Sequence, residues 1–513
     1  MKKIFLILFL ALVVRLVGIS WALPSVYHVD EITLVRAGMG MRFGDLNPHF
    51  FDWPSLYKYL NFFLSTAFIK FRVPFQLLFG VETMRQALPF WWGSTAPFHL
   101  LTRLMTMCFD LGSVGLTFLI GRKLYGRRVG LLAALVMALS FTNVHGVQFS
   151  RVDVPTLFFI LTSFCFSTLI LEKGRLKDYL LAGLFAGFAT STKYNGALIV
   201  IPIITAHFLR ILAARRIFQP VGFFFGGLLL SGLAAVGGFF LGSPYFLLDF
   251  KNAWGSVDKQ GSFIWQVNST GQGHNWLNFI NRSMRADWGI LMCLLFFGGV
   301  IWAIKKHRKK DILLLSFPLA YFAYAGSWGI VRSHYILLLY PFLALLAARF
   351  VLSFLEQHKV LRLHWLVLAV CLIHPFSRIV ENDISGLRGD TRNLARDWIL
   401  ENVPFETSIA LDSSKLTSYL GGSLPNLPQI ENGQGYFLHP FEKIVLKYGQ
   451  DWEKVSLEFE ERGVEFFVTS SFVHSRYQDK TFYALLDEKA NLVKEFPADW
   501  RTGPEIEIYR LND

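Results

Sequence analysis

The sequence has 513 residues, of which 53% are hydrophobic, and its mean hydropathy is +0.41. This excludes an ordinary soluble enzyme, because apolar segments of about 20 residues recur and each could cross a bilayer as a helix. The net charge of +13 is uneven: residues 380–513 carry 14 Lys and Arg against 23 Asp and Glu, whereas the rest carries 36 against 14. The excess positive charge lies in short loops, so the high pI indicates membrane topology and no nucleic-acid partner.

The first apolar segment, "MKKIFLILFLALVVRLVGISWA", has two interpretations. Its basic start, apolar centre and small residues near Ala22 are typical of a signal peptide. However, Arg15 interrupts the apolar centre. We therefore expect a retained first span with its N-terminus in the cytoplasm.

Clusters of Lys and Arg mark the cytoplasmic loops of a membrane protein. Here they occur at 2–3, 121–128, 172–178, 210–216, 305–310 and 349–362. If all of them are inside, the chain is a polytopic α-helical membrane protein with about 11 transmembrane helices, an inside N-terminus and an outside C-terminus. The expected spans are 4–22, 98–120, 130–148, 154–171, 179–195, 197–213, 220–242, 289–304, 312–328, 335–350 and 362–378.

Residues 56–80 are apolar enough to cross but contain Lys58, Lys70 and Arg72. A crossing here would move the basic cluster at 121–128 to the outside. We therefore expect an interfacial or re-entrant helix. The long outer loops are then 23–97, which holds this helix, and 243–288, both within a membrane domain of residues 1–379.

Residues 380–513 are expected to form a soluble α/β domain on the outer, extracytoplasmic side. "DTRNLARDWILENVP" (390–404) has the pattern of a capped helix, because Asp390 can accept from first-turn amides and Pro404 follows the end. Four segments are typical of strands: "TSIALDSS", "VEFFVTSS", "NLVKEF" and "EIEIYRL". No glycine-rich nucleotide signature is present, so a structural or substrate-shaping role is expected.

Three carboxylates fall on the expected outer face. Asp30 and Glu31 follow the first span, and Asp153 lies between two spans. A partly desolvated carboxylate there could act as a general base. The alternatives are a solvated pair of acids for the first two and a helix cap before Pro155 for the third.

Cations and polar rings gather on the same expected face: Lys58, Arg103, Lys193, Arg332, His334 and Tyr335. Several cations on one face suit an anionic phosphate held at the membrane surface. Snorkelling explains a single lysine near a helix end equally well. The other histidines are scattered and the four cysteines lie in apolar segments, so neither a metal site nor a disulfide framework is expected.

With these motifs in order, the sequence resembles the GT-C superfamily of membrane glycosyltransferases. It is nearest the branch of protein O-mannosyltransferases and lipid A aminoarabinose transferase, the bacterial glycosyltransferase family 39-like proteins. The chain has "WPSL" where many relatives have two consecutive prolines. The motifs that carry the resemblance are "YHVDE", "WPSLYKYL", "RLMTMCFDLGSVGLTFLIGRKLYG", "FSRVDVP", "STKYNGALIVIP", "GSPYFLLDF", "RSHYILLLYPFLALLAA" and the tail's "DTRNLARDWILENVP".

The resemblance implies an inverting transfer of a sugar from a polyprenyl-phosphate carrier to an acceptor on the outer side. It assigns Asp30 as catalytic base, Glu31 as its support and Asp153 to orienting the acceptor or the base. Lys193, Arg103 and Arg332 would neutralise the departing lipid phosphate, with Lys58 at an approximately matching position. No cofactor is implied, and the acceptor could be a lipid, a protein or a polysaccharide. The resemblance and the topology imply an integral protein of a bacterial inner membrane.

Three other interpretations remain. A flippase for a lipid-linked sugar also needs polar groups within a bundle, but no internal repeat is apparent and the acids lie in outer loops. An oligosaccharide ligase or polymerase shares the lipid-phosphate substrate without the early Asp-Glu. A non-catalytic scaffold leaves Asp30 and Asp153 unexplained.

Overall fold

The computed structural model describes residues 2–80, 95–214, 221–265, 275–412, 427, 429, 436–440, 451–471, 481–498 and 503–511. Residues 81–94 of the first expected outer loop and 266–274 of the second lie outside these ranges. The chain forms two compact units, each described below by itself. We call Met1–Ile19, Thr33–Ala87 and Phe98–Val380 the helical unit, and Ser20–Ile32, Leu88–Pro97 and Glu381–Asp513 the sheet unit.

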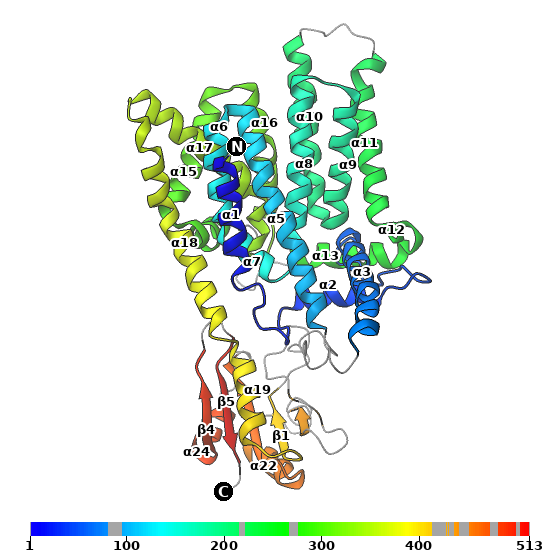
Figure 1. Cartoon of the computed structure of the whole chain (residues 1–513), viewed down its shortest axis with the longest axis vertical. Helices are drawn as coiled ribbons and strands as arrows, with labels where there is room; N and C mark the ends of the chain where they lie inside the picture. Colours follow the sequence, from blue (N-terminus) through cyan, green and yellow to red (C-terminus); the bar gives the residue numbers. More distant parts are fainter. Residues whose placement is uncertain are drawn as a thin grey trace. The chain divides into compact units, whose positions relative to one another are not determined.

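Helices dominate the first part of the chain (Figure 1). In order they are α1 (Lys2–Leu16), α2 (Val29–Gly40), α3 (Leu56–Phe79), α5 (Ala96–Tyr125), α6 (Arg127–Ala138), α7 (Phe141–Gln148), α8 (Asp153–Glu172), α9 (Leu176–Thr192), η2 (Tyr194–Ile199), α10 (Val200–Ala214), α11 (Val221–Gly242), α12 (Tyr245–Leu248), α13 (Phe250–Trp265), α14 (Trp276–Asn278), η3 (Phe279–Met284), α15 (Arg285–Lys306), α16 (Lys309–Gly326), η4 (Ser333–Leu339), α17 (Tyr340–Gln357), η5 (Leu361–Leu363) and α18 (His364–Leu387).

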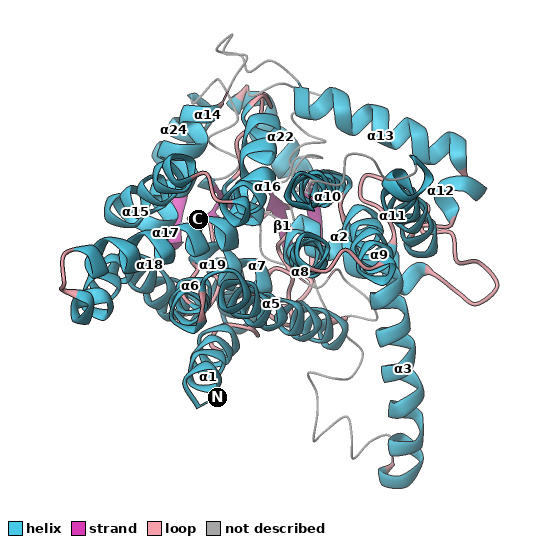
Figure 2. Ribbon diagram, turned by 90° about the horizontal axis from the view of Figure 1, so that it is seen from above, coloured by secondary structure: helices cyan, strands magenta, loops and turns pink. Residues whose placement is uncertain are grey.

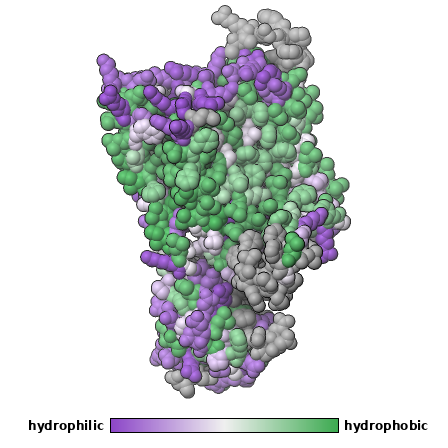
Figure 3. Space-filling model, in the orientation of Figure 1, coloured by the Kyte–Doolittle hydropathy of each residue, from purple (hydrophilic) through white to green (hydrophobic). Residues whose placement is uncertain are grey.

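Every span expected from the sequence falls on one or two of these helices. Seven helices of the described chain are long and apolar enough to cross a membrane, or eight if the bent pair α6 and α7 is one span. The others at expected positions, α1, α9 and α16, are short or begin with charged residues. Large apolar side chains such as Leu229, Leu233 and Ile301 are exposed. Figure 3 shows a broad apolar surface, in green, over the helices. The protein is an integral membrane protein, because such a surface needs lipid around it.

The helices α8, α9, α10 and α11 run side by side in Figures 1 and 2. Small residues allow α9 and α11 to approach closely. A Cβ added to Gly183 would lie 2.1 Å from the carbonyl oxygen of Ser231, and one added to Gly187 would lie 2.3 Å from that of Ala235. This four-residue spacing of glycines is a common packing motif of membrane helices, and it explains why the two backbones can touch.

The expected straight span at 130–148 is instead two helices, α6 and α7, bent by 50° at a break. A break inside the bilayer leaves carbonyl groups without helical partners. Arg15 of α1 supplies the donors, because its Nη1 lies 2.9 Å from the carbonyl oxygen of Ala138 and its Nη2 lies 3.3 Å from that of Met137. Its Nε donates to buried Asp110 of α5, to which Asn143 Nδ2 also donates at 2.5 Å. The arginine that argued against a signal peptide therefore joins three helices.

Two helices lie across the spans rather than along them. Figure 2 shows α8 to α11 end-on, whereas α3 and α13 are seen along their length. Neither is among the candidate spans of the described residues. This orientation is the one expected for interfacial helices, as the lysines and arginine of 56–80 suggested.

The sheet unit contains five described strands in the order β2-β1-β3-β5-β4. β1 is parallel to β2 and β3, whereas β5 is antiparallel to β3 and β4. The described elements are α19 (Thr391–Asn402), β1 (Ser408–Leu411), β2 (Phe437–Pro440), α22 (Trp452–Glu461), β3 (Phe466–Ser470), α24 (Thr481–Lys489), β4 (Asn491–Phe496) and β5 (Ile506–Arg510). The expected helix and four expected strands are all present, and β2 was not foreseen.

The helix α19 begins as its sequence predicts, with the carboxylate of Asp390 accepting from the Arg392 amide at 3.0 Å. The segment Ser20–Ile32 joins this unit through Tyr27. Its hydroxyl donates to Asn393 Oδ1 at 2.7 Å, and the guanidinium of Arg392 lies 3.5 Å from its ring centroid. The loop after the first span is thus held to α19 by a polar bond and a cation–π contact.

Candidate functional site

An ion pair at the ends of two spans is the centre of the candidate site in the helical unit. Asp153 is the first residue of α8, and Lys193 follows the last residue of α9 in an extended conformation. The Lys193 Nζ donates to Asp153 Oδ1 at 2.7 Å. The Asp153 side chain is 3% exposed and that of Lys193 is 15% exposed, so the amine is the group that a ligand could reach.

The amine also faces an aromatic ring. Lys193 Nζ lies 5.1 Å from the ring centroid of Tyr335, which belongs to η4. Two residues that the sequence did not single out hold the backbone that carries this ring. The hydroxyl of Tyr321 donates to the Tyr335 carbonyl at 2.8 Å, and Asn195 Nδ2 donates to the Tyr321 hydroxyl at 2.7 Å. A tyrosine inside an apolar segment gives no signal, but Asn195 lies two residues after Lys193 and could have been considered.

Further cations flank the pair. Arg151, two residues before Asp153, forms a short contact with the Nδ1 of His334. Arg332 is exposed, precedes η4, and forms no ion pair within the described part of the chain. Two more permanent cations therefore stand on the segments that carry Asp153 and Tyr335, and such a set of cations favours an anion.

The segments that carry Lys193 and Arg332 have the same local design. Each cation has an extended backbone, with φ of −150° for Lys193 and −134° for Arg332. Each is followed by a 3-10 helix and then a span that begins near a proline, Pro202 or Pro341. The tight 3-10 turns leave the cation outside the regular helix, where its side chain can reach the site.

Lys58 and Arg103 are buried and bound to backbone carbonyls. Lys58 donates to the carbonyls of Phe50 and, at 2.7 Å, Trp53. Burial lowers the pKa of Lys58 to about 7, partly offset by the charge of Asp52. Arg103 Nη1 donates to the carbonyl of Ile19 at 2.8 Å. Both side chains hold the backbone around the first outer loop.

Asp30 and Glu31 lie in the first turn of α2. Glu31 is fully buried, whereas Asp30 is half-buried. By helical periodicity Glu31 shares a stripe with Leu34 and Gly38, which are three and seven positions on. Leu34 is buried, and a Cβ on Gly38 would lie 2.9 Å from that of Asn61 in α3. Asp30 precedes Glu31 by one residue and therefore lies beside this packed stripe on the helix surface. It is the more accessible of the two acids.

No group of three or more His, Cys, Asp or Glu side chains in the described ranges could hold a metal ion.

Comparisons with known proteins agree with this description. Residues 100–236 match the family model of dolichyl-phosphate-mannose-protein mannosyltransferase, and this range contains Arg103, Asp153 and Lys193. No curated protein matches the sequence. The structure of ArnT from Cupriavidus metallidurans in the apo state has 14% identity and a TM-score of 0.52, with 99% of this chain and 97% of that chain covered. The chain has the GT-C fold.

Two further structures carry lipid phosphates. ArnT bound to undecaprenyl phosphate also has 14% identity and a TM-score of 0.52, covering 99% of this chain and 98% of that one. The archaeal oligosaccharyltransferase AglB from Archaeoglobus fulgidus, in complex with an inhibitory peptide and a dolichol-phosphate, has 10% identity and a TM-score of 0.49 over 91% of this chain and 69% of that one. The likeness to ArnT shows a shared fold.

Proposed function

We propose that this protein is an inverting glycosyltransferase that moves a sugar from a polyprenyl-phosphate carrier to an acceptor on the extracytoplasmic side of the membrane. The Lys193–Asp153 pair carries the proposal, because a cation at a membrane-helix end with further cations beside it suits a lipid phosphate. The match of residues 100–236 to a mannosyltransferase family supports it. The proposed location is a bacterial inner membrane, and the basic loops support an N-terminus in the cytoplasm.

The reaction divides the charged residues into two roles. The acceptor hydroxyl oxygen forms the new bond to the anomeric carbon, and its proton passes to Asp30, with Glu31 in support. The bond from that carbon to the phosphate oxygen breaks, and the electron pair leaves with the lipid phosphate. Lys193 and Arg332 neutralise the charge that develops there.

The remaining residues have positioning roles. Asp153 holds the Lys193 amine at 2.7 Å and can orient the acceptor or the base. His334 and Tyr335, both in η4, face the lipid phosphate and help to bind it. Lys58 and Arg103, which bind carbonyls, keep the first outer loop in place and so act on the phosphate indirectly. The acceptor is a lipid, a protein or a polysaccharide.

The test uses the full-length protein in proteoliposomes with defined polyprenyl-phosphate sugars. We expect sugar transfer and release of polyprenyl phosphate in equal amounts. Asp30→Asn should abolish transfer, and Lys193→Met should reduce it strongly. Lys177→Met, which removes an exposed lysine at the other end of α9 from Lys193, is the matched control and should transfer normally.

Two outcomes contradict parts of this proposal. Transfer at the parental rate by a folded Asp30→Asn variant would remove the base assignment. Movement of the lipid-linked sugar between leaflets without any transfer would establish the alternative, a flippase or transporter for lipid-linked sugars.

A further inference from the structure

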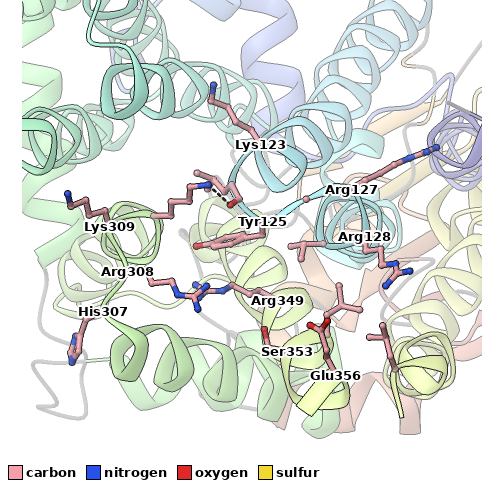
Figure 4. A pocket seen from close by; sticks show the side chains of 16 residues that line it. Lys123, Tyr125, Arg127, Arg128, His307, Arg308, Lys309, Arg349, Ser353 and Glu356 are labelled. Carbon is pink, nitrogen blue, oxygen red and sulfur yellow. Dashed lines mark hydrogen bonds between the residues drawn. The ribbon is translucent and has the colours of Figure 1, made fainter. Parts of the chain in front are cut away.

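A second charged feature of the helical unit lies away from the candidate site. It is a cavity of about 1060 Å³, which we call the basic pocket (Figure 4). Its volume reaches the upper end of the roughly 300–1,000 Å³ of small-molecule sites. It is lined by Lys123, Leu124, Tyr125, Gly126, Arg127, Arg128, Val129, His307, Arg308, Lys309, Lys310, Arg349, Leu352, Ser353, Glu356 and Leu361.

The basic pocket lies at the opposite end of α8 from Asp153. Its Lys123 forms an ion pair with Glu172, the last residue of α8, at 2.6 Å. The 20 residues of α8 span about 30 Å, close to the thickness of a hydrocarbon core. A ligand in the basic pocket is therefore distinct from a sugar donor at Asp153.

One cation of the pocket is held rigidly. Arg349 is buried and forms an ion pair with buried Asp311. The hydroxyl of Tyr125 donates to Asp311 Oδ1 at 2.7 Å, and the guanidinium of Arg349 lies 4.4 Å from the Tyr125 ring centroid. These contacts fix the guanidinium in place before any ligand arrives, which lowers the entropic cost of binding.

A second guanidinium faces the first. In Figure 4 the side chains of Arg308 and Arg349 point toward each other, and their charges interact repulsively. Arg308 comes from the α15–α16 connection and Arg349 from α17, so the fold itself brings the two like charges together. An anion between them would turn this repulsion into two charge-assisted contacts.

The other cations of the basic pocket add to its positive charge, and several of them form no ion pair with a described residue. Lys123 is paired with Glu172, and Lys310 Nζ donates to the Leu124 carbonyl at 3.0 Å. Within the described part of the chain, Arg127, Arg128, Arg308 and Lys309 form no ion pair. The one carboxylate of the lining is Glu356, against seven Lys and Arg side chains.

Membrane topology alone explains why basic loops lie on one side of the membrane, but the side chains of such loops normally extend into solvent. Topology does not explain a cavity in which two guanidiniums face each other and one of them is buried in a network of contacts. The apolar lining residues Leu352, Leu361 and Val129 suit a ligand with an apolar part beside its charge.

We propose that the basic pocket binds the phosphate group of an anionic ligand, either the headgroup of a membrane lipid or a small soluble phosphate. Arg308 and Arg349 bind the phosphate oxygens, and Arg128 completes the site from the first turn of α6. Bound phosphate then ties α6, the α15–α16 connection and α17 together.

The experiment compares soluble probes on the full-length protein in phosphatidylcholine nanodiscs. The probes are dihexanoyl phosphatidic acid, dihexanoyl phosphatidylcholine and inorganic phosphate, and the readouts are the dissociation constant and the shift in Tm. Arg308→Gln and Arg128→Gln change exposed residues and so preserve the fold. Each should weaken binding roughly tenfold. Lys177→Gln, with the same charge change at the same end of the helical unit but outside the pocket, should leave binding within about twofold.

The probes also identify the source of the phosphate. If phosphatidic acid binds much more tightly than inorganic phosphate and loses affinity in Arg308→Gln, the ligand is a lipid headgroup. If inorganic phosphate binds equally well with the same dependence on Arg308, the ligand is a soluble phosphate. The proposal is overturned if neither anion binds, if phosphatidylcholine binds as well, or if Lys177→Gln weakens binding as much as Arg308→Gln.

Discussion

Two aspartate–cation pairs of the helical unit differ in burial and in how many donors of the cation are already bound. We call Arg15–Asp110 the closed pair and Lys193–Asp153 the open pair. Arg15 and Asp110 are both fully buried, and Arg15 also donates to three backbone carbonyls. Lys193 lies at a helix end, is 15% exposed, and has Asp153 as its hydrogen-bond partner. The first pair has its donors occupied and stabilises a bend. In the second, the Lys193 amine makes one hydrogen bond to the described residues, so it can still donate to a ligand.

The largest expected effect comes from breaking the closed pair. Arg15→Met leaves Asp110 buried without its cation and removes the side-chain donor of the Ala138 carbonyl, whereas the Met137 carbonyl keeps the Ser140 amide. The free energy of unfolding should fall by about 3–5 kcal/mol. Unfolding in mixed detergent micelles measures this.

The double variant Arg15→Met, Asp110→Leu serves as the control. Because it also removes the unpaired carboxylate, it should be more stable than the single variant. Parental stability of Arg15→Met would show that the buried pair contributes nothing.

The open pair should behave in the opposite way. Lys193→Met should lower the rate of sugar transfer by about 100-fold, since it removes a cation from the developing charge. Its loss of stability should be smaller than that of Arg15→Met. Transfer assays and unfolding of the same preparation give both quantities, and an equal loss of stability would erase the distinction between the pairs.

A buried carboxylate that forms no ion pair with any described residue, Asp412, extends the comparison to the sheet unit. Asp412 follows β1 and accepts from Thr469 at 2.6 Å and Tyr483 at 2.8 Å. Burial raises the pKa of Asp412 to about 7. The folded state thus holds a proton that the unfolded state has lost between about pH 4 and pH 7, so stability falls as pH rises through this window.

The expected loss of stability is on the order of 4 kcal/mol across that window. Hydrogen exchange of the β1 and β3 amides in the full-length protein measures it. Asp412→Asn, which cannot ionise, should remove this part of the pH dependence. An unchanged pH profile in the variant would show that another group is responsible.

The smallest effect concerns the ring beside Lys193. Tyr335→Phe keeps the cation–π contact and should be nearly silent, whereas Tyr335→Leu loses about 0.5–1 kcal/mol. The KM for the lipid donor should then rise roughly two- to fivefold. If the Phe and Leu variants behave alike, the ring face has no part in binding.

The sequence predicted what depends on local pattern. Apolar segments located the spans, and Asp390 located the start of α19. The fold confirms both, whereas the assignment of Asp30 as base stays a prediction. The strand β2 was missed because its four residues end at Pro440, and proline is unfavourable within a sheet.

Long-range polar contacts could not be predicted from the sequence either. Arg15 was recognised as unusual, but its partners depend on the break between α6 and α7, which apolar composition does not reveal. Likewise, the bond from Tyr321 to the carbonyl of Tyr335 needs the three-dimensional packing of α16 against η4. Charge placement alone was enough to put Asp153 and Lys193 on the same face.

The Arg15 contacts also determine when, during synthesis, α1 can reach its final position. Asp110 lies 95 residues after Arg15 in the chain, and the Ala138 carbonyl lies 123 residues after it. At about 5–20 residues per second, the ribosome needs roughly 6–25 s to reach these partners. During synthesis α1 therefore waits with an unpaired arginine, and its final position is set only when the α6–α7 bend emerges.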